Sequence, residues 1–149
     1  MREFTTYMDI ALAEARLAGE RGETPVGAVI IANGEILAQN GNRTRELCEP
    51  TAHAEILVIR AACAASGSER LQNADLYVTL EPCPMCAMAI SSARVARVYY
   101  GAADPKSGGI EQGPRIFSHP QCHHKPEVYG GINEAESGDL LWAFFETRR

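Results

Sequence analysis

Hydrophobic positions recur with a helical period in the first part of the chain. Between residues 3 and 19 they return every three or four positions, which predicts an amphipathic helix that Gly19 and Gly22 end. A β-branched run at 26–31 and an apolar run at 35–38 follow, with Asn33-Gly34 between them. Asn-Gly between apolar runs is the strongest short signal for a hairpin, so the two runs predict antiparallel strands. The residues that share the helical face are Phe4, Tyr7, Met8, Ala11, Leu12, Ala15 and Ala18.

The middle of the chain alternates between helical and strand-like runs. Residues 51–65 are rich in Ala, Ile and Leu and predict a helix that ends at the following Ser-Gly-Ser. The apolar runs at 75–80 and 95–101 predict strands. Between them, Pro84 suits the first position of a helix that continues to Ile90. A strand, a helix and a strand joined by short connections imply parallel pairing with a right-handed crossover.

The last third of the chain has a weaker pattern. A turn-rich loop at 104–109 leaves the carboxyl end of a strand, where α/β proteins gather ligands, although an ordinary solvated loop has the same composition. Residues 111–131 are irregular apart from a short edge strand at Val128-Tyr129. Asn133 followed by Glu136 predicts a capped final helix. We therefore expect an α/β fold with three α/β/α layers, in which a mixed five-stranded sheet carries helices on both faces.

Length and composition indicate one domain in a reducing compartment. The chain has 149 residues, so we expect residues 1–149 to form a single domain. No apolar run could span a membrane, and the acidic amphipathic start is unlike a targeting peptide. Five cysteines without a secretory signal favour the cytoplasm, and we expect Cys48, Cys63 and Cys122 to be small buried hydrophobes. The net charge of −5 argues mildly against nucleic acid, but local fields rather than the total steer a ligand.

Candidate chemistry is concentrated at Cys83 and Cys86. Because Pro84 begins a helix, both sulfurs lie at its first turn, where the positive end of the helix dipole stabilises thiolates. The Cys-x-x-Cys spacing alone leaves metal binding, a redox dithiol and two buried thiols open.

His53 and Glu55 form a second element near the start of a predicted helix. On a helix flank they point about 200° apart, so one pocket uses both only if the helix directs its N-terminal end at that pocket. Alone, His-x-Glu is more typical of an ordinary helix start. Combined with the cysteines it resembles the His-x-Glu … Pro-Cys-x-x-Cys signature of zinc-dependent nucleobase deaminases. We therefore predict that His53, Cys83 and Cys86 bind one zinc per chain and that Glu55 is an acid outside the ligand set.

Three protein ligands leave a fourth zinc position for water, which indicates a catalytic site unless Cys48 or His123 closes the coordination. Zinc lowers the pKa of such a water. Glu55 would take the water proton, pass it to the ring nitrogen beside the attacked carbon, and later protonate the leaving amine. The pair His123-His124 leaves a second metal site open as well.

Six stretches resemble bacterial tRNA-specific adenosine deaminases of the cytidine-deaminase-like superfamily. The resemblance implies the cytidine-deaminase-like fold, a homodimer, and conversion of the wobble adenosine (position 34) of tRNA-Arg to inosine. It also implies that the flipped base or the anticodon loop contacts Asn42, Ala54, Asp104, Lys106 and Phe145. The stretches are Pro25 to Val29, Gly41 to Arg43, Pro50 to Glu55, Leu76 to Cys86, Gly101 to Gly108 and Phe144 to Arg149.

Some residues depart from that family. Pro84 also occurs in guanine deaminases, and Gly113-Pro114-Arg115 and His123-His124 differ from the usual pattern. Two other functions therefore stay open. One is a deaminase of a free base or nucleoside, such as guanine or cytosine. The other is a zinc-stabilised RNA-binding module without turnover, against which the presence of Glu55 argues. An RNA-facing basic rim requires the loops to bring together Arg43, Arg45, Lys106, Lys125, Arg148 and Arg149.

Overall fold

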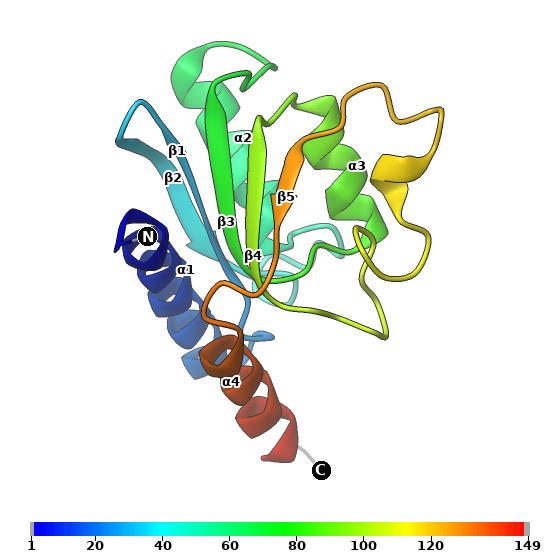
Figure 1. The fold of residues 1–149 in the computed structure, drawn as a ribbon. Helices are drawn as coiled ribbons and strands as arrows, with labels where there is room; N and C mark the ends of the chain where they lie inside the picture. Colours follow the sequence, from blue (N-terminus) through cyan, green and yellow to red (C-terminus); the bar gives the residue numbers. More distant parts are fainter. Residues whose placement is uncertain (1, 148–149) are drawn as a thin grey trace.

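A sheet of five strands runs through the molecule in the order β2-β1-β3-β4-β5 (Figure 1). The structure is a computed structural model that describes the backbone of residues 2–147 and the side chains of residues 7–147. Strand β1 pairs antiparallel with β2 and β3, whereas β3, β4 and β5 run parallel, which confirms the predicted mixed sheet. The strands are β1 (Gly27–Ala32), β2 (Glu35–Gly41), β3 (Ala74–Leu80), β4 (Arg97–Ala102) and β5 (Glu127–Tyr129).

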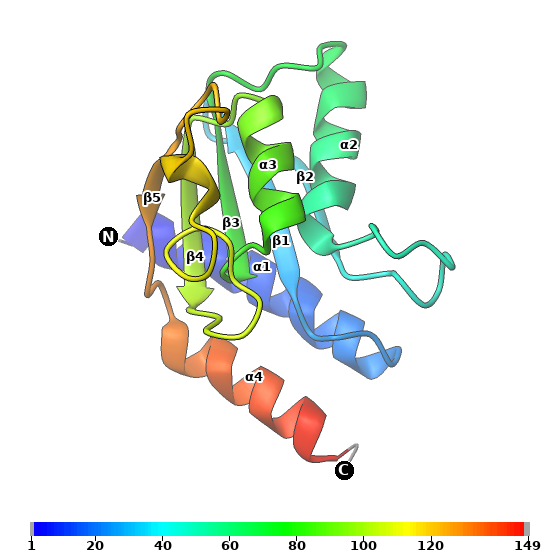
Figure 2. The same ribbon diagram turned by 90° about the vertical axis from the view of Figure 1, so that its right-hand side faces the viewer.

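Helices cover both faces of this sheet, which confirms the three predicted layers (Figure 2). On one face lie α1 (Arg2–Glu20) and α4 (Glu134–Glu146), and on the other lie α2 (Ala54–Ser66) and α3 (Pro84–Ser92). A short 3-10 turn, η1 (Ile116–Ser118), packs against α3. Within residues 2–147, no helix has the length and apolar character needed to cross a membrane.

Successive apolar side chains of the strands alternate between the two faces of the sheet and form a separate core on each face. Leu76 and Val78 pack toward α2 and α3, whereas Val29, Tyr77 and Tyr99 pack toward α1. This division follows from the strand geometry, because successive side chains point to opposite faces. Burying one large apolar side chain completely stabilises a fold by about 1.5–3 kcal/mol. Because such side chains lie on both faces of the sheet, each helical layer adds to the stability by covering one face.

Local turn chemistry agrees with the predicted hairpin. Asn33 and Gly34 both have positive φ angles, 53° and 76°, which a type I′ turn requires. The turn joins β1 and β2 between Ala32 and Glu35, which are the last paired residues of the hairpin.

The predicted cap of the last helix has the right position but the wrong contacts. Asn133 is the residue before α4, yet its φ is 56° and its side chain makes no capping bond. Its amide instead donates to Asp9 Oδ1 at 3.3 Å, and Glu136 forms an ion pair with Arg16. Contacts with α1 therefore replace the local capping box.

The prediction that three cysteines are buried is correct only in part. Cys122 is buried and Cys63 is half-buried, but Cys48 is exposed. Cys48 lies in a turn with a φ of 51°, and its side chain is exposed. The prediction for Cys48 was wrong because the loop before α2 extends over the surface.

The carboxyl ends of β3 and β4 and the N-terminal ends of α2 and α3 meet at one edge of the sheet (Figure 2). Helix α2 begins at Ala54, later than the predicted residue 51, so His53 is its N-cap. Cys83 is the N-cap of α3, and Pro84 is the first helical residue as predicted. This edge therefore brings together the residues that carry the candidate chemistry.

Candidate metal centre and active site

Three potential metal ligands converge between the starts of α2 and α3. The ligand atoms of His53, Cys83 and Cys86 all lie within 4.8 Å of one another. His53 Nδ1 is 3.6 Å from Cys83 Sγ and 3.5 Å from Cys86 Sγ. Because His53 and Cys83 are N-cap residues, their side chains leave the helix ends rather than the flanks. The two helix ends therefore point at the same small volume.

These distances fit zinc. Tetrahedral zinc, with bonds of about 2.3 Å to sulfur and about 2.0–2.1 Å to nitrogen, places a sulfur and a nitrogen ligand about 3.6 Å apart. No other His, Cys, Asp or Glu joins the group within the described part of the chain. Cys48 was a candidate fourth ligand, but its Sγ lies 3.8 Å from the Arg45 carbonyl oxygen and outside the metal group. The donor set is that of a three-ligand site with one position open.

The hydrogen bond between the two thiols shifts their pKa values in opposite directions. Hydrogen bonds from Cys86 and then His53 lower the pKa of Cys83 to about 4. The same bond to Cys83, together with burial, raises the pKa of Cys86. The hydrogen bond to Cys83 also raises the pKa of His53. Cys83 is thus already a thiolate at neutral pH, the form that binds a metal, and zinc binding would displace the remaining proton.

Glu55 lies in the first turn of α2 and is only 4% exposed. Burial is the main reason that its pKa rises from 4.5 to about 7. A carboxyl with this pKa exists in both protonation states at neutral pH, so it can accept a proton and return it. Glu55 therefore has the properties of a proton carrier next to the metal group.

The metal group opens into a cavity of about 180 Å³. His53, Glu55 and Cys83 form part of its wall, and four other segments of the chain complete it. The remaining lining residues are Thr24, Val26, Asn42, Leu80, Glu81, Asp104 and Ser107.

Asn42 is held in a defined orientation in this wall. Its Oδ1 accepts a hydrogen bond of 2.8 Å from the Ala54 backbone N–H, and Arg21 donates to its carbonyl at 2.9 Å. This bond identifies the atom facing Ala54 as the amide oxygen, and the Nδ2 group of Asn42, a residue of the cavity wall, is a hydrogen-bond donor. Ala54 itself is fully buried, and its N–H serves Asn42.

The other expected substrate contacts lie around the cavity or further away. Asp104 lines the cavity, and its Oδ1 accepts backbone hydrogen bonds from Lys106 and Ser107, which fixes the turn. The Lys106 side chain is exposed at the same turn. Phe145 lies on α4, outside the cavity, and is 50% exposed. Near it, Trp142, the only tryptophan, is 66% exposed.

Three residues of the candidate basic rim, Arg43, Arg45 and Lys125, have local partners, and Arg45 donates to the Gly22 carbonyl at 3.2 Å. The Lys125 ammonium donates to the carbonyls of Phe117, His119 and Cys122, so it serves its own loop. Arg43 pairs with Glu46 at 2.7 Å. The last two arginines, 148 and 149, lie outside the described residues.

Sequence reasoning missed two buried acids beside the cavity, Glu23 and Glu81, each 2% exposed. Glu23 accepts hydrogen bonds from the N–H groups of Arg45 and Glu46 at 3.1 and 2.8 Å. Burial raises the pKa of Glu23, but these bonds outweigh that effect and lower it. The one signal in the sequence is the position of Glu81 directly after an apolar strand.

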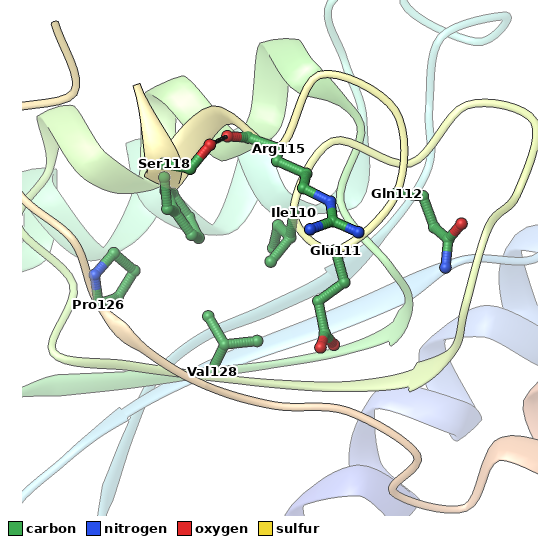
Figure 3. A pocket seen from close by; sticks show the side chains of 8 residues that line it. Ile110, Glu111, Gln112, Arg115, Ser118, Pro126 and Val128 are labelled. Atoms are coloured by element: carbon green, nitrogen blue, oxygen red, sulfur yellow. Dashed lines mark hydrogen bonds between the residues drawn. The ribbon is translucent and has the colours of Figure 1, made fainter. Parts of the chain in front are cut away.

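A larger hollow of about 510 Å³ lies on another part of the surface (Figure 3). Its wall includes Glu111, Arg115 and Val128 but none of the metal group. Figure 3 shows Arg115 and Glu111 among the side chains that line it. The smaller cavity is the candidate active site because His53 and Cys83 of the metal group line it together with Glu55.

Comparisons with known proteins agree with this geometry. Residues 1–102 match the cytidine and deoxycytidylate deaminase zinc-binding region. The tRNA-specific adenosine deaminase of Agrobacterium fabrum is 60% identical over 149 residues, which cover 100% of this chain and 98% of that protein. Its counterpart in Bacillus subtilis is 46% identical over 149 residues, which cover 100% of this chain and 92% of that protein.

A solved structure extends the agreement to the fold. It comes from studies of A-to-I editing by tRNA:A34 deaminases at the wobble position of transfer RNA. It is 62% identical, has a TM-score of 0.91, and covers 92% of this chain and 99% of its own. The predicted cytidine-deaminase-like fold is thereby confirmed. This chain belongs to the family of tRNA-specific adenosine deaminases.

Proposed function

We propose that this protein converts the wobble adenosine (position 34) of tRNA-Arg to inosine and releases ammonia. The observation that carries the proposal is a three-ligand metal group, two of whose ligands line a cavity together with a buried acid, Glu55, whose pKa is about 7. One zinc per chain would be held by His53, Cys83 and Cys86. Bound there, zinc would supply a water with a lowered pKa.

Glu55 carries the protons of the reaction. It accepts the proton of the attacking water and donates it to the ring nitrogen beside the attacked carbon. It then transfers the second water proton to the departing amine, which leaves as ammonia. The pKa of Glu55, about 7, suits both half-steps, because neither protonation state is strongly favoured at neutral pH.

Asn42 and the surrounding loops bind the substrate. The Nδ2 group of Asn42 donates to the flipped base or its ribose, in an orientation that the bond from Ala54 supports. Asp104, Lys106 and Phe145 contact the anticodon loop, and Ala54 lies against the base. The exposure of Lys106 and Phe145 supports this assignment, because phosphates and unstacked bases bind to exposed cations and rings.

The remaining parts of the proposal concern the whole protein. Residues 1–149 act as one deaminase domain, and two copies form a homodimer in the cytoplasm. Full-length identity to tRNA-specific adenosine deaminases supports the single domain, since 100% of this chain aligns with them.

The decisive experiment compares RNA with free bases. Inosine formation is measured in an anticodon stem-loop with adenosine at the wobble position, and ammonia release is measured from free adenine, guanine, cytosine and cytidine. A stem-loop with guanosine at that position is the matched control. We expect turnover of the adenosine stem-loop alone. Turnover of a free base without turnover of the stem-loop would favour a free-base deaminase, and zinc-dependent binding without any turnover would favour an RNA-binding module.

A further inference from the structure

Glu81 follows the last residue of β3 and precedes the cysteine helix, and its carboxylate gathers backbone donors from a distant loop. Its Oε1 accepts a hydrogen bond from Asp104 N–H at 3.0 Å. Its Oε2 accepts three, from Ile110 at 3.1 Å, Glu111 at 2.8 Å and Gln112 at 3.0 Å. All four donors belong to the segment 103–112 that follows β4, which we call the β4 loop.

These bonds occupy both oxygens of Glu81. An ionised carboxylate offers about four lone-pair sites, and four N–H groups are in place. Three of the four bonds fall on Oε2 and one on Oε1, so Glu81, although it lies in the wall of the cavity, uses most of its acceptor capacity on the backbone of this segment. Its carboxylate holds the backbone of the β4 loop through hydrogen bonds.

The β4 loop is also packed closely against this anchor. A Cβ on Gly108 would lie 2.7 Å from the Glu81 carboxyl carbon, and a Cβ on Gly109 would lie 2.5 Å from Pro84 N. Gly109 donates to the Pro82 carbonyl at 2.8 Å. A side chain at Gly108 or Gly109 would clash with these atoms, so the β4 loop packs directly against the turn that carries Cys83.

The anchored loop carries the residues that face the substrate. Asp104 and Ser107 line the cavity, and the exposed Lys106 lies between them. The four hydrogen bonds to the Glu81 carboxylate therefore hold the β4 loop in a fixed position at the wall of the cavity. We propose that Glu81 is a positioning residue that sets the β4 loop over the cavity and thereby determines the affinity for RNA. This inference rests on the proposed function for its substrate.

The test uses Glu81→Gln, which keeps the shape of the side chain but loses acceptor capacity on one side. We expect the KM for the adenosine stem-loop to rise by on the order of tenfold, the loss expected for one charge-assisted hydrogen bond. The kcat should stay within about threefold, and its pH profile should not change, because Glu81 carries no proton in the reaction. A fall in kcat with a shifted pH profile would make Glu81 a catalytic acid and would overturn the inference.

A double variant identifies the route by which Glu81 acts. If Glu81 positions Lys106, the effects of Glu81→Gln and Lys106→Ala on KM should be less than additive. Additive effects would show that the two residues act independently, which contradicts the inference. Glu81→Asp keeps the charge but is one methylene shorter, so it should also raise KM. A normal KM would mean that the charge of Glu81 matters and its reach does not, which contradicts the positioning role.

Amide hydrogen exchange supplies a measurement that needs no substrate. In zinc-loaded Glu81→Gln, the N–H groups of residues 104 and 110–112 should exchange faster, with zinc content and exchange in β1 unchanged. Unchanged exchange in the β4 loop would overturn the positioning role whatever the substrate is. Inactivity of the unsubstituted protein on the stem-loop would instead overturn the proposed function. Glu35→Gln, an exposed site at the hairpin, is the matched control and should change none of these values.

Discussion

The buried carboxyl of Glu55 should make the metal-free protein less stable as the pH rises. Its folded pKa of about 7 lies above the ordinary value of 4.5, mainly because of burial. The folded state therefore holds this proton more tightly than the unfolded state. Between pH 4.5 and 7 unfolding releases the proton, so the free energy of unfolding falls with pH and levels off above the folded pKa. Glu55→Gln stays neutral and should escape this loss.

The size of the effect follows from the two pKa values. At 1.36 kcal/mol for each pH unit, the difference between 4.5 and about 7 corresponds to about 3 kcal/mol when the carboxyl is fully ionised. At pH 5 the cost is about 1 kcal/mol, and at pH 8 it is close to its limit. The stability advantage of Glu55→Gln should therefore grow by about 2 kcal/mol between pH 5 and pH 8.

The measurement is urea unfolding of chelated protein, followed by circular dichroism at several pH values. Glu35→Gln removes an exposed carboxyl and should leave the pH dependence of unfolding unchanged. A variant that is less stable than the unsubstituted protein at pH 8, or an advantage that is constant with pH, would refute the reasoning. Such a result would mean that Glu55 is well solvated or paired when the metal is absent.

Three further outcomes follow from the site. Zinc analysis should give about one equivalent per chain and should fall to background in the double variant Cys83→Ser, Cys86→Ser; retained zinc would contradict the ligand set. Glu55→Ala should keep its zinc and its fold but lose about 10²–10⁴-fold in kcat, and near-normal turnover would remove Glu55 from the mechanism. Lys106→Ala should weaken stem-loop binding and flatten the slope of log K against log salt by roughly 0.7, whereas an unchanged slope would exclude a phosphate contact.

The metal group was predictable because its ligands belong to short local patterns. Pro84 marks the first residue of α3, which places Cys83 and Cys86 at the helix start without reference to the rest of the chain. The strands were predictable for a related reason, since the Asn33-Gly34 turn and the runs beside it are local signals.

Contacts between distant segments explain what the sequence left hidden. The donors to Glu81 lie between 23 and 31 residues further along the chain, so nothing near Glu81 identifies them. Asn133 has the composition of a cap, but Asp9 on α1 binds its side chain instead. The expected burial of Cys48 rested on composition, which does not determine whether a loop runs over the surface.

The single tryptophan gives the protein an unusual optical property. Trp142 is 66% exposed on α4 and contributes to neither core, so its surroundings change little when the cores melt. Its fluorescence should therefore be a weak reporter of global unfolding. The same exposure makes it sensitive to anything that covers the outer side of α4, because displacement of water around the indole shifts the emission. A stem-loop that reaches Phe145 should thus produce an emission change at RNA concentrations that leave circular dichroism unaltered.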